Sequence, residues 1–132
     1  MKVAINGFGR IGKIAFQIAI EKGLDVVAVN DPFLAPDYIE YLLKYDTVHG
    51  KFNGELSHDE NNIIVNGKKI RVFNELEPKN VPWGELEVHT VIECSGVFVE
   101  VEKAQAFLDA GAKKVVISAP SKTAPMFVMG VN

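Results

Sequence analysis

The sequence predicts an α/β fold whose doubly wound, mostly parallel sheet contains one inserted antiparallel hairpin. Apolar runs of strand length alternate with segments whose apolar residues recur at helical spacing, which is typical of βαβ units. A glycine turn with the spacing Gly7-x-Gly9-x-x-Gly12 joins the first strand to the first helix. The dipeptide Asn66-Gly67 separates two later strand-like runs and indicates a hairpin, because both residues tolerate the positive φ angles of a type I′ turn.

Composition fits one domain with a hydrophobic core, since 48% of the 132 residues are hydrophobic and 23% are charged. The net charge is −3 and no basic run exceeds two lysines, so neither a dedicated nucleic-acid surface nor a dedicated membrane surface is expected. No signal peptide or long apolar span is visible, which favours a cytoplasmic location. The single cysteine, Cys94, excludes an intrachain disulfide, and the scattered histidines predict no metal site.

In the first half of the chain, residues 2–6 are expected to form a buried parallel strand, followed by a helix that ends near Gly23. Residues 25–30 are nearly all apolar, as in a parallel strand covered on both faces. This strand delivers Asp31 to the carboxyl edge of the sheet, where ligands bind in open α/β folds. Residues 36–45 predict a helix with one apolar face, and a proline is acceptable in its first turn.

The second half continues the alternation of strand-like and helix-like segments. The expected elements are strands over 63–65 and 69–73, a loop over 74–84, a strand over 88–94, a helix over 101–108, a strand over 114–118 and a strand-like run over 126–131.

The glycine turn and the acid after the second strand together predict a dinucleotide site. The first glycine permits a tight turn, the second lets the backbone approach a pyrophosphate, and the third lets the helix pack closely on the strand. Backbone N–H groups around Arg10 and Ile11 would hold the pyrophosphate, and the Arg10 side chain is a further candidate for the anion. Asp31 would accept hydrogen bonds from the ribose hydroxyls and repel the extra phosphate of NADP, which predicts NAD. The structural alternative for Asp31 is a strand-end acid that binds nearby loop N–H groups.

Five ordered stretches resemble the phosphorylating glyceraldehyde-3-phosphate dehydrogenases. They are residues 5–12 (INGFGRIG), 30–33 (NDPF), 95–98 (SGVF), 117–120 (ISAP) and 126–132 (MFVMGVN). The resemblance implies that residues 1–132 form the family's NAD-binding Rossmann domain and end before its catalytic domain. In the whole enzyme it implies a homo-oligomer that oxidises and phosphorylates glyceraldehyde 3-phosphate in glycolysis, with NAD as hydride acceptor. That substrate and phosphate would bind only with the missing domain.

The residues expected at the cofactor are Gly7, Phe8, Gly9, Arg10, Ile11, Gly12, Asn30, Asp31, Pro32, Leu76, Ser95, Gly96, Phe98, Ser118 and Ala119. By resemblance, Phe98 borders the adenine pocket, while Ser118 and Ala119 approach the nicotinamide ribose. Ordinary strand-end packing is the alternative for these three. Leu76 stands where family members commonly have an arginine, which exchanges a cationic contact near the adenine for an apolar one. Ser95 stands in place of a threonine and keeps the hydroxyl.

No catalytic residue is expected within these 132 residues. The family's nucleophilic cysteine lies in a Ser-Asn-Ala-Ser-Cys-Thr-Thr-Asn segment with a histidine base further on, and neither segment occurs here. Cys94 is interpreted as a core cysteine. His49 lies in the 45–52 loop, which resembles a loop near subunit contacts, and is expected to be exposed or structural. The chain alone is therefore expected to bind cofactor without turnover.

Two other interpretations remain open. The chain resembles the corresponding domain of erythrose-4-phosphate dehydrogenase, and it is also compatible with a stand-alone nucleotide-binding or interaction module. Because the family's domain is completed by a further strand and a C-terminal helix, an open sheet edge and self-association are expected here.

Overall fold

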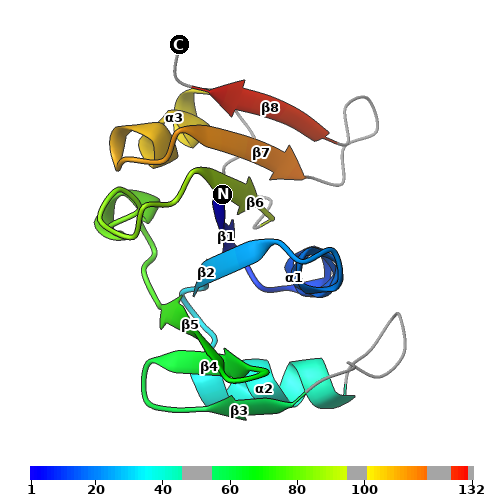
Figure 1. Ribbon diagram of the computed structural model, residues 1–132. Coiled ribbons are helices and arrows are strands. Elements are labelled where there is room, and N and C mark those ends of the chain that lie inside the picture. Colours follow the sequence, from blue (N-terminus) through cyan, green and yellow to red (C-terminus); the bar gives the residue numbers. More distant parts are fainter. Residues whose placement is uncertain (46–54, 95–100, 119–125, 131–132) are drawn as a thin grey trace.

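The computed structural model describes residues 1–45, 55–94, 101–118 and 126–130. Within these residues, eight strands form one sheet in the order β3-β4-β5-β2-β1-β6-β7-β8 (Figure 1). The strands are β1 (Lys2–Asn6), β2 (Asp25–Asn30), β3 (Leu56–His58), β4 (Asn62–Val65), β5 (Lys68–Phe73), β6 (Thr90–Glu93), β7 (Lys114–Ser118) and β8 (Met126–Gly130). The helices are α1 (Arg10–Glu21), α2 (Pro36–Tyr45) and α3 (Val101–Asp109), with a 3₁₀ turn, η1 (Pro78–Asn80).

The middle of the sheet is parallel and both of its sides are antiparallel. Strands β5, β2, β1, β6 and β7 pair in parallel, which confirms the doubly wound plan. The predicted hairpin is β4 and β5, and its turn has φ angles of 51° at Asn66 and 84° at Gly67. Two antiparallel pairings were not expected: β3 with β4, and β8 with β7. Only residues 119–125 separate β7 from β8, too few for the crossover that a parallel pairing requires.

Most element bounds agree with the sequence expectation, and β6 is the main exception. The predicted strand over 88–94 is shorter in the structure, where β6 runs over Thr90–Glu93. Its pairing nevertheless extends further at both ends, because His89 N–H donates to Lys2 O at 2.8 Å and Cys94 N–H donates to Asn6 O at 2.8 Å. The ladder therefore carries the end of β6 to the same edge as the end of β1.

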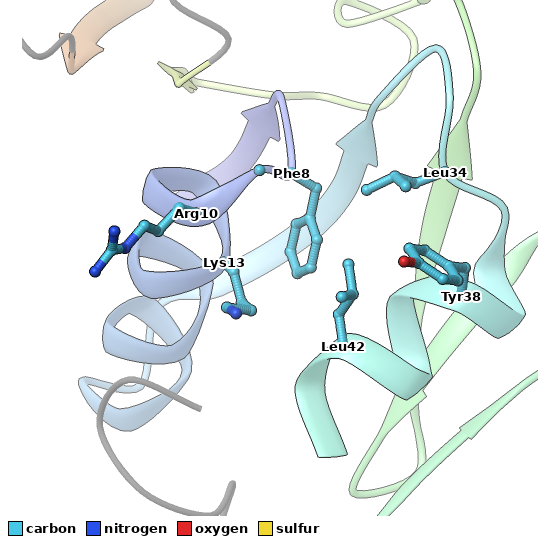
Figure 2. A pocket seen from close by; sticks show the side chains of 7 residues that line it. Phe8, Arg10, Lys13, Leu34, Tyr38 and Leu42 are labelled. Carbon is cyan, nitrogen blue, oxygen red and sulfur yellow. The ribbon is translucent and has the colours of Figure 1, made fainter. Parts of the chain in front are cut away.

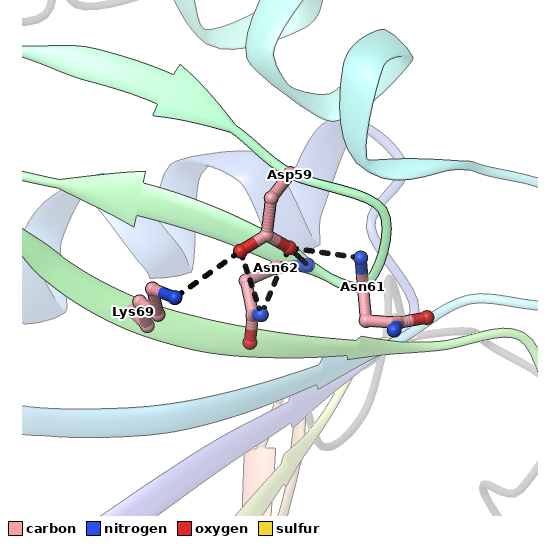
Figure 3. Close-up of polar contacts among 4 residues, drawn as sticks. All are labelled: Asp59, Asn61, Asn62 and Lys69. Carbon is pink, nitrogen blue, oxygen red and sulfur yellow. Dashed lines mark hydrogen bonds and ion pairs between the residues drawn. The ribbon is translucent and has the colours of Figure 1, made fainter.

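A side-chain cap organises the connection between β3 and β4 (Figure 3). Asp59 Oδ1 accepts hydrogen bonds from the backbone N–H groups of Asn61 and Asn62, at 2.9 and 2.8 Å. Lys69 Nζ, on β5, lies 3.5 Å from Asp59 Oδ2. These contacts therefore stabilise the turn between β3 and β4 on the antiparallel side of the sheet. The sequence pattern did not predict the short strand β3.

Buried side chains fill both faces of the sheet, as a doubly wound fold requires. On β1, Ile5 belongs to one core cluster and the adjacent Ala4 to another, since successive residues of a strand face opposite ways. The first cluster packs α1 and α2 against the sheet through residues such as Phe16 and Leu43. The second contains Trp83, which is fully buried although it lies in a loop. Among the described helices, none is long and apolar enough to cross a membrane.

Candidate nucleotide-binding site

The glycine turn connects the end of β1 to the start of α1. Gly7 has a φ of 93°, a conformation that favours glycine, and its N–H donates to Asn30 O on β2 at 2.7 Å. A Cβ atom at Gly12 would overlap the carbonyl oxygen of Gly7. The third glycine therefore allows the close helix-to-strand packing that the sequence spacing predicted.

The N-terminus of α1 carries no side-chain cap. Gly9 is the N-cap residue, with a φ of −79° and no side-chain hydrogen bond to the first turn. The first N–H groups of a helix have no intrahelical partner and carry partial positive charge. The first turn of α1, which begins at Arg10, therefore presents donors suited to an anion.

Asp31 ties the glycine turn to the loop after β2. Its Oδ2 accepts a hydrogen bond from Phe8 N–H at 2.8 Å, and its Oδ1 accepts one from Phe33 N–H at 2.9 Å. These are the loop contacts that were the structural alternative for this acid. A carboxylate has about four lone-pair sites, so both oxygens keep acceptor capacity for further donors. The structural contacts and a ribose contact are therefore compatible.

A cavity of about 430 Å³ lies at this edge of the sheet. Its lining residues come from the carboxyl ends of β1, β2 and β6 and from two loops: Asn6, Gly7, Gly9, Asn30, Asp31, Pro32, Phe33, Glu75, Leu76 and Cys94. Phe33 is 83% exposed and Leu76 is 70% exposed, so both apolar side chains are accessible to a ligand in the cavity. The cavity thus combines two acidic residues, Asp31 and Glu75, with apolar side chains, and a few polar groups in an apolar setting suit a nucleoside.

A second hollow of about 490 Å³ lies beside the glycine turn, with lining residues from α1 and α2 (Figure 2). It shares Gly9 with the first cavity and is otherwise lined by Phe8, Arg10, Lys13, Leu34, Tyr38 and Leu42. Figure 2 shows the Arg10 side chain extending away from the apolar members of this group. The hollow contains no carboxylate, and helix side chains rather than strand ends form most of its wall, so the cavity beside Asp31 is the better nucleoside site.

Cys94 lines the first cavity but is not an activated thiol. Burial, with a smaller contribution from the negative charge of Glu93, raises the pKa of Cys94 to about 12. The thiol is therefore protonated at neutral pH, whereas nucleophilic cysteines have lowered pKa values. In the part of the chain that the structure describes, no group of three His, Cys, Asp or Glu side chains could hold a metal ion.

Comparisons with known proteins agree with this geometry. The family described as "Glyceraldehyde 3-phosphate dehydrogenase, NAD binding domain" matches residues 1–101. Over its whole length the chain is 59% identical to glyceraldehyde-3-phosphate dehydrogenase 1 of Kluyveromyces marxianus and 59% identical to the Phytophthora infestans enzyme. It is 56% identical to glyceraldehyde-3-phosphate dehydrogenase 2 of Saccharomyces cerevisiae. The chain belongs to the glyceraldehyde-3-phosphate dehydrogenase family. Its cofactor is NAD, and it spans about 40% of the length of these curated relatives.

Several of the residues expected at the cofactor of this glyceraldehyde-3-phosphate dehydrogenase domain come together. Those that line the cavity are Gly7, Gly9, Asn30, Asp31, Pro32 and Leu76. Arg10 lines the second hollow, while Ile11 and Gly12 follow it on α1. Ser118 ends β7, the strand that pairs with β6, and its place at the cofactor stays a prediction. Ser95, Gly96, Phe98 and Ala119, like the 46–52 part of the loop that contains His49, lie outside the described residues.

Phe8 differs from its neighbours in the glycine turn. Its side chain is fully buried and packs edge-on against Phe16, with 5.6 Å between ring centroids. Its N–H is already bonded to Asp31. The role of Phe8 at the cofactor therefore stays a prediction, and the structure places its side chain in the core.

Sequence reasoning missed three cavity-lining residues besides Cys94. Asn6, Phe33 and Glu75 line the cavity, and each lies directly beside a residue that was expected there. Position next to a motif was the available signal, but it does not tell which neighbours face the cavity. That depends on how the strand ends and loops pack.

Proposed function

We propose that the cavity beside Asp31 holds the adenosine half of NAD, with the pyrophosphate at the first turn of α1. The observation that carries this proposal is the position of the Asp31 carboxylate, which lines the cavity while it is bonded to the glycine turn. The exposed Phe33 and Leu76 side chains would contact the adenine, because flat apolar contact suits an aromatic base.

The same carboxylate would select NAD over NADP. Its free lone pairs suit the two ribose hydroxyls, whereas a 2′-phosphate would meet a negative charge. The uncapped first turn of α1 supports the pyrophosphate position, because backbone N–H groups and the helix dipole both favour an anion there.

For the whole protein, we propose phosphorylating oxidation of glyceraldehyde 3-phosphate in cytoplasmic glycolysis by a homo-oligomer. Bound NAD would supply the hydride acceptor. The share of this chain would be to bind and orient NAD, because its one cysteine is a protonated thiol and the family's nucleophile segment lies outside residues 1–132. On this proposal the domain ends before the catalytic half.

Calorimetric titration of the 132-residue chain with NAD and with NADP tests the proposal. The parent chain should bind NAD more tightly, and Asp31→Ala should narrow the difference by removing the repulsion of the 2′-phosphate. Asp59→Ala is the matched control, because Asp59 also accepts two backbone N–H bonds but lies away from the cavity. Equal affinity of the parent chain for the two cofactors would contradict the role proposed for Asp31.

A further inference from the structure

Three polar side chains lie side by side under the cavity. Asn6, Asn30 and Glu93 are the last residues of β1, β2 and β6, which are neighbours in the sheet, and Asn6 is in register with both others. Their exposed fractions are 3%, 1% and 0%. Buried polar groups of this kind are costly unless they are hydrogen-bonded, so their partners carry information.

The three side chains form a hydrogen-bonded chain that ends on a loop backbone. Asn30 Nδ2 donates to Asn6 Oδ1 at 2.7 Å, and Asn6 Nδ2 donates to Glu93 Oε1 at 3.0 Å. At the other end, Asn30 Nδ2 donates to Glu75 O at 3.0 Å and Glu75 N–H donates to Asn30 Oδ1 at 2.9 Å. The amide of Asn30 thus holds both backbone groups of Glu75.

The direction of these hydrogen bonds is determined by the Glu75 backbone. The backbone N–H of Glu75 can only donate, so the atom of Asn30 that faces it is the carbonyl oxygen. The amide nitrogen of Asn30 therefore faces Asn6, whose own nitrogen must face Glu93. A carboxylate oxygen suits this last position because it accepts without carrying a donor into the buried site.

The side chain of Asn30 therefore has a structural role besides its predicted place at the cofactor. Both Nδ2 hydrogens are taken by Asn6 and Glu75, so Asn30 has no donor left for a cofactor. Its two bonds to the Glu75 backbone hold the residue next to Leu76, which forms part of the apolar wall of the cavity.

We propose that Glu93 is a positioning residue for the nucleotide, which acts through Asn6 and Asn30 on the Glu75 backbone and so sets the place of the Leu76 wall. The inference rests on the proposed function, in which this cavity holds the adenosine half of NAD. Buried hydrogen bonds polarise one another, so reversing a donor or acceptor at any of these three side chains should change the hydrogen bonds to the Glu75 backbone.

The test exchanges the acid and the amide. Asn6→Asp alone sets a carboxylate against Glu93, which repels it and leaves an acceptor facing an acceptor. In the double variant Asn6→Asp/Glu93→Gln, the amide at position 93 donates to the carboxylate at position 6, which still accepts from Asn30. The order of donors and acceptors is then restored with the charge moved by one strand.

The readouts are the affinity for AMP, which represents the adenosine half alone, and the nitrogen-15 NMR position of the Glu75 amide. Asn6→Asp should weaken AMP binding by about tenfold, and the double variant should return to within about threefold of the parent. Glu93→Gln alone should shift the NMR signal of the Glu75 amide and weaken the affinity for AMP by about threefold. The reason is that an added N–H₂ group must be accommodated in a buried site. Val115→Ala is the control for a general loss of stability. It opens a void in the core cluster that contains Trp83, and Val115 does not line the cavity.

A merely structural role predicts a different pattern. If the double variant regains the parent melting temperature but not AMP affinity, or if Asn6→Asp binds AMP like the parent, the inference is wrong. If Asn6→Asp does not fold, Glu93→Gln decides, and an unchanged Glu75 amide with unchanged affinity overturns the proposal. A folded parent chain that binds neither NAD nor AMP would overturn the proposed function as well, whereas a parent that binds with unaffected variants overturns this inference alone.

Discussion

The Asp31 carboxylate accepts a hydrogen bond from the backbone N–H of Phe8, with 2.8 Å between Oδ2 and N. One acid at the end of β2 thereby fixes the glycine turn that follows β1, although 23 residues separate the pair in sequence. The two motifs that indicated a dinucleotide site are therefore one connected structure. Substitutions in the turn should affect binding and stability differently, depending on which side of the turn they touch.

Gly12→Ala should destabilise the chain, and Gly9→Ala should not. A Cβ at Gly12 overlaps the carbonyl of Gly7, whereas one at Gly9 meets nothing within 4 Å. We expect Gly12→Ala to cost about 1–3 kcal/mol of unfolding free energy, as overpacked sites do. Gly9→Ala should leave the urea unfolding midpoint unchanged and weaken NAD binding, because the added methyl group would lie where the pyrophosphate reaches the first turn of α1. Urea unfolding and calorimetry measure both, and equal midpoints for the two variants would contradict the packing argument.

Acid should weaken the antiparallel side of the sheet through Asp59. The backbone hydrogen bond from Asn61, followed by that from the Asn62 side chain, lowers the pKa of the Asp59 carboxyl. A lowered pKa in the folded state contributes stability that is complete above the unfolded value of about 3.9 and is lost as the pH falls through the folded value. Urea midpoints between pH 7 and pH 2 should therefore fall less steeply for Asp59→Asn. If the urea midpoints of the parent chain and of Asp59→Asn fall equally between pH 7 and pH 2, the charge of Asp59 contributes nothing to stability.

Alkylation of Cys94 should be slow in the folded chain and fast after denaturation. Burial raises the pKa of this thiol to about 12, so little thiolate exists at neutral pH. The pKa of Cys94 in the folded chain lies above the value of about 8.5 in the unfolded chain. The protonated thiol therefore contributes its full stability below about pH 8.5, and this contribution is lost as the pH rises from there toward 12. Iodoacetamide labelling with and without urea measures the difference. Rapid labelling without urea at neutral pH would mean that the thiol is more accessible and more acidic than its surroundings imply.

The chain should show no phosphate-dependent oxidation of glyceraldehyde 3-phosphate on its own. Its cysteine is protonated, and it spans about 40% of the length of its relatives. An NADH absorbance assay with substrate and phosphate measures this directly. Turnover that Cys94→Ala abolishes would overturn the assignment of Cys94 as a non-catalytic residue.

The chain should self-associate as its concentration rises. Strand β8 is at one end of the sheet order, and no described strand pairs with its outer edge. Unpaired N–H and C=O groups on an edge strand invite pairing with another chain, and a symmetric dimer is the simplest closed form. Sedimentation across a concentration series tests the expectation. A well-folded monomer at high concentration would mean that this edge is closed in another way.

The sequence by itself determined the parts of this protein that depend on near neighbours. Helices α1 and α2, strands β1 and β2 and the Asn66-Gly67 turn were predictable because periodicity, glycine and proline act over a few residues. The same holds for the position of Asp31, which follows from the length of the second strand.

Only the tertiary structure decided which distant groups meet. The antiparallel place of β8 follows from a short connection within the folded sheet, and the β3 strand exists because β4 supplies its pairing partner. The link from Glu93 through Asn6 to Asn30 depends on three strand ends lying adjacent in register. Buried side-chain hydrogen bonds depend on direction and on distances of about 3 Å, and residues 24 and 87 positions apart acquire such distances only when the sheet has formed.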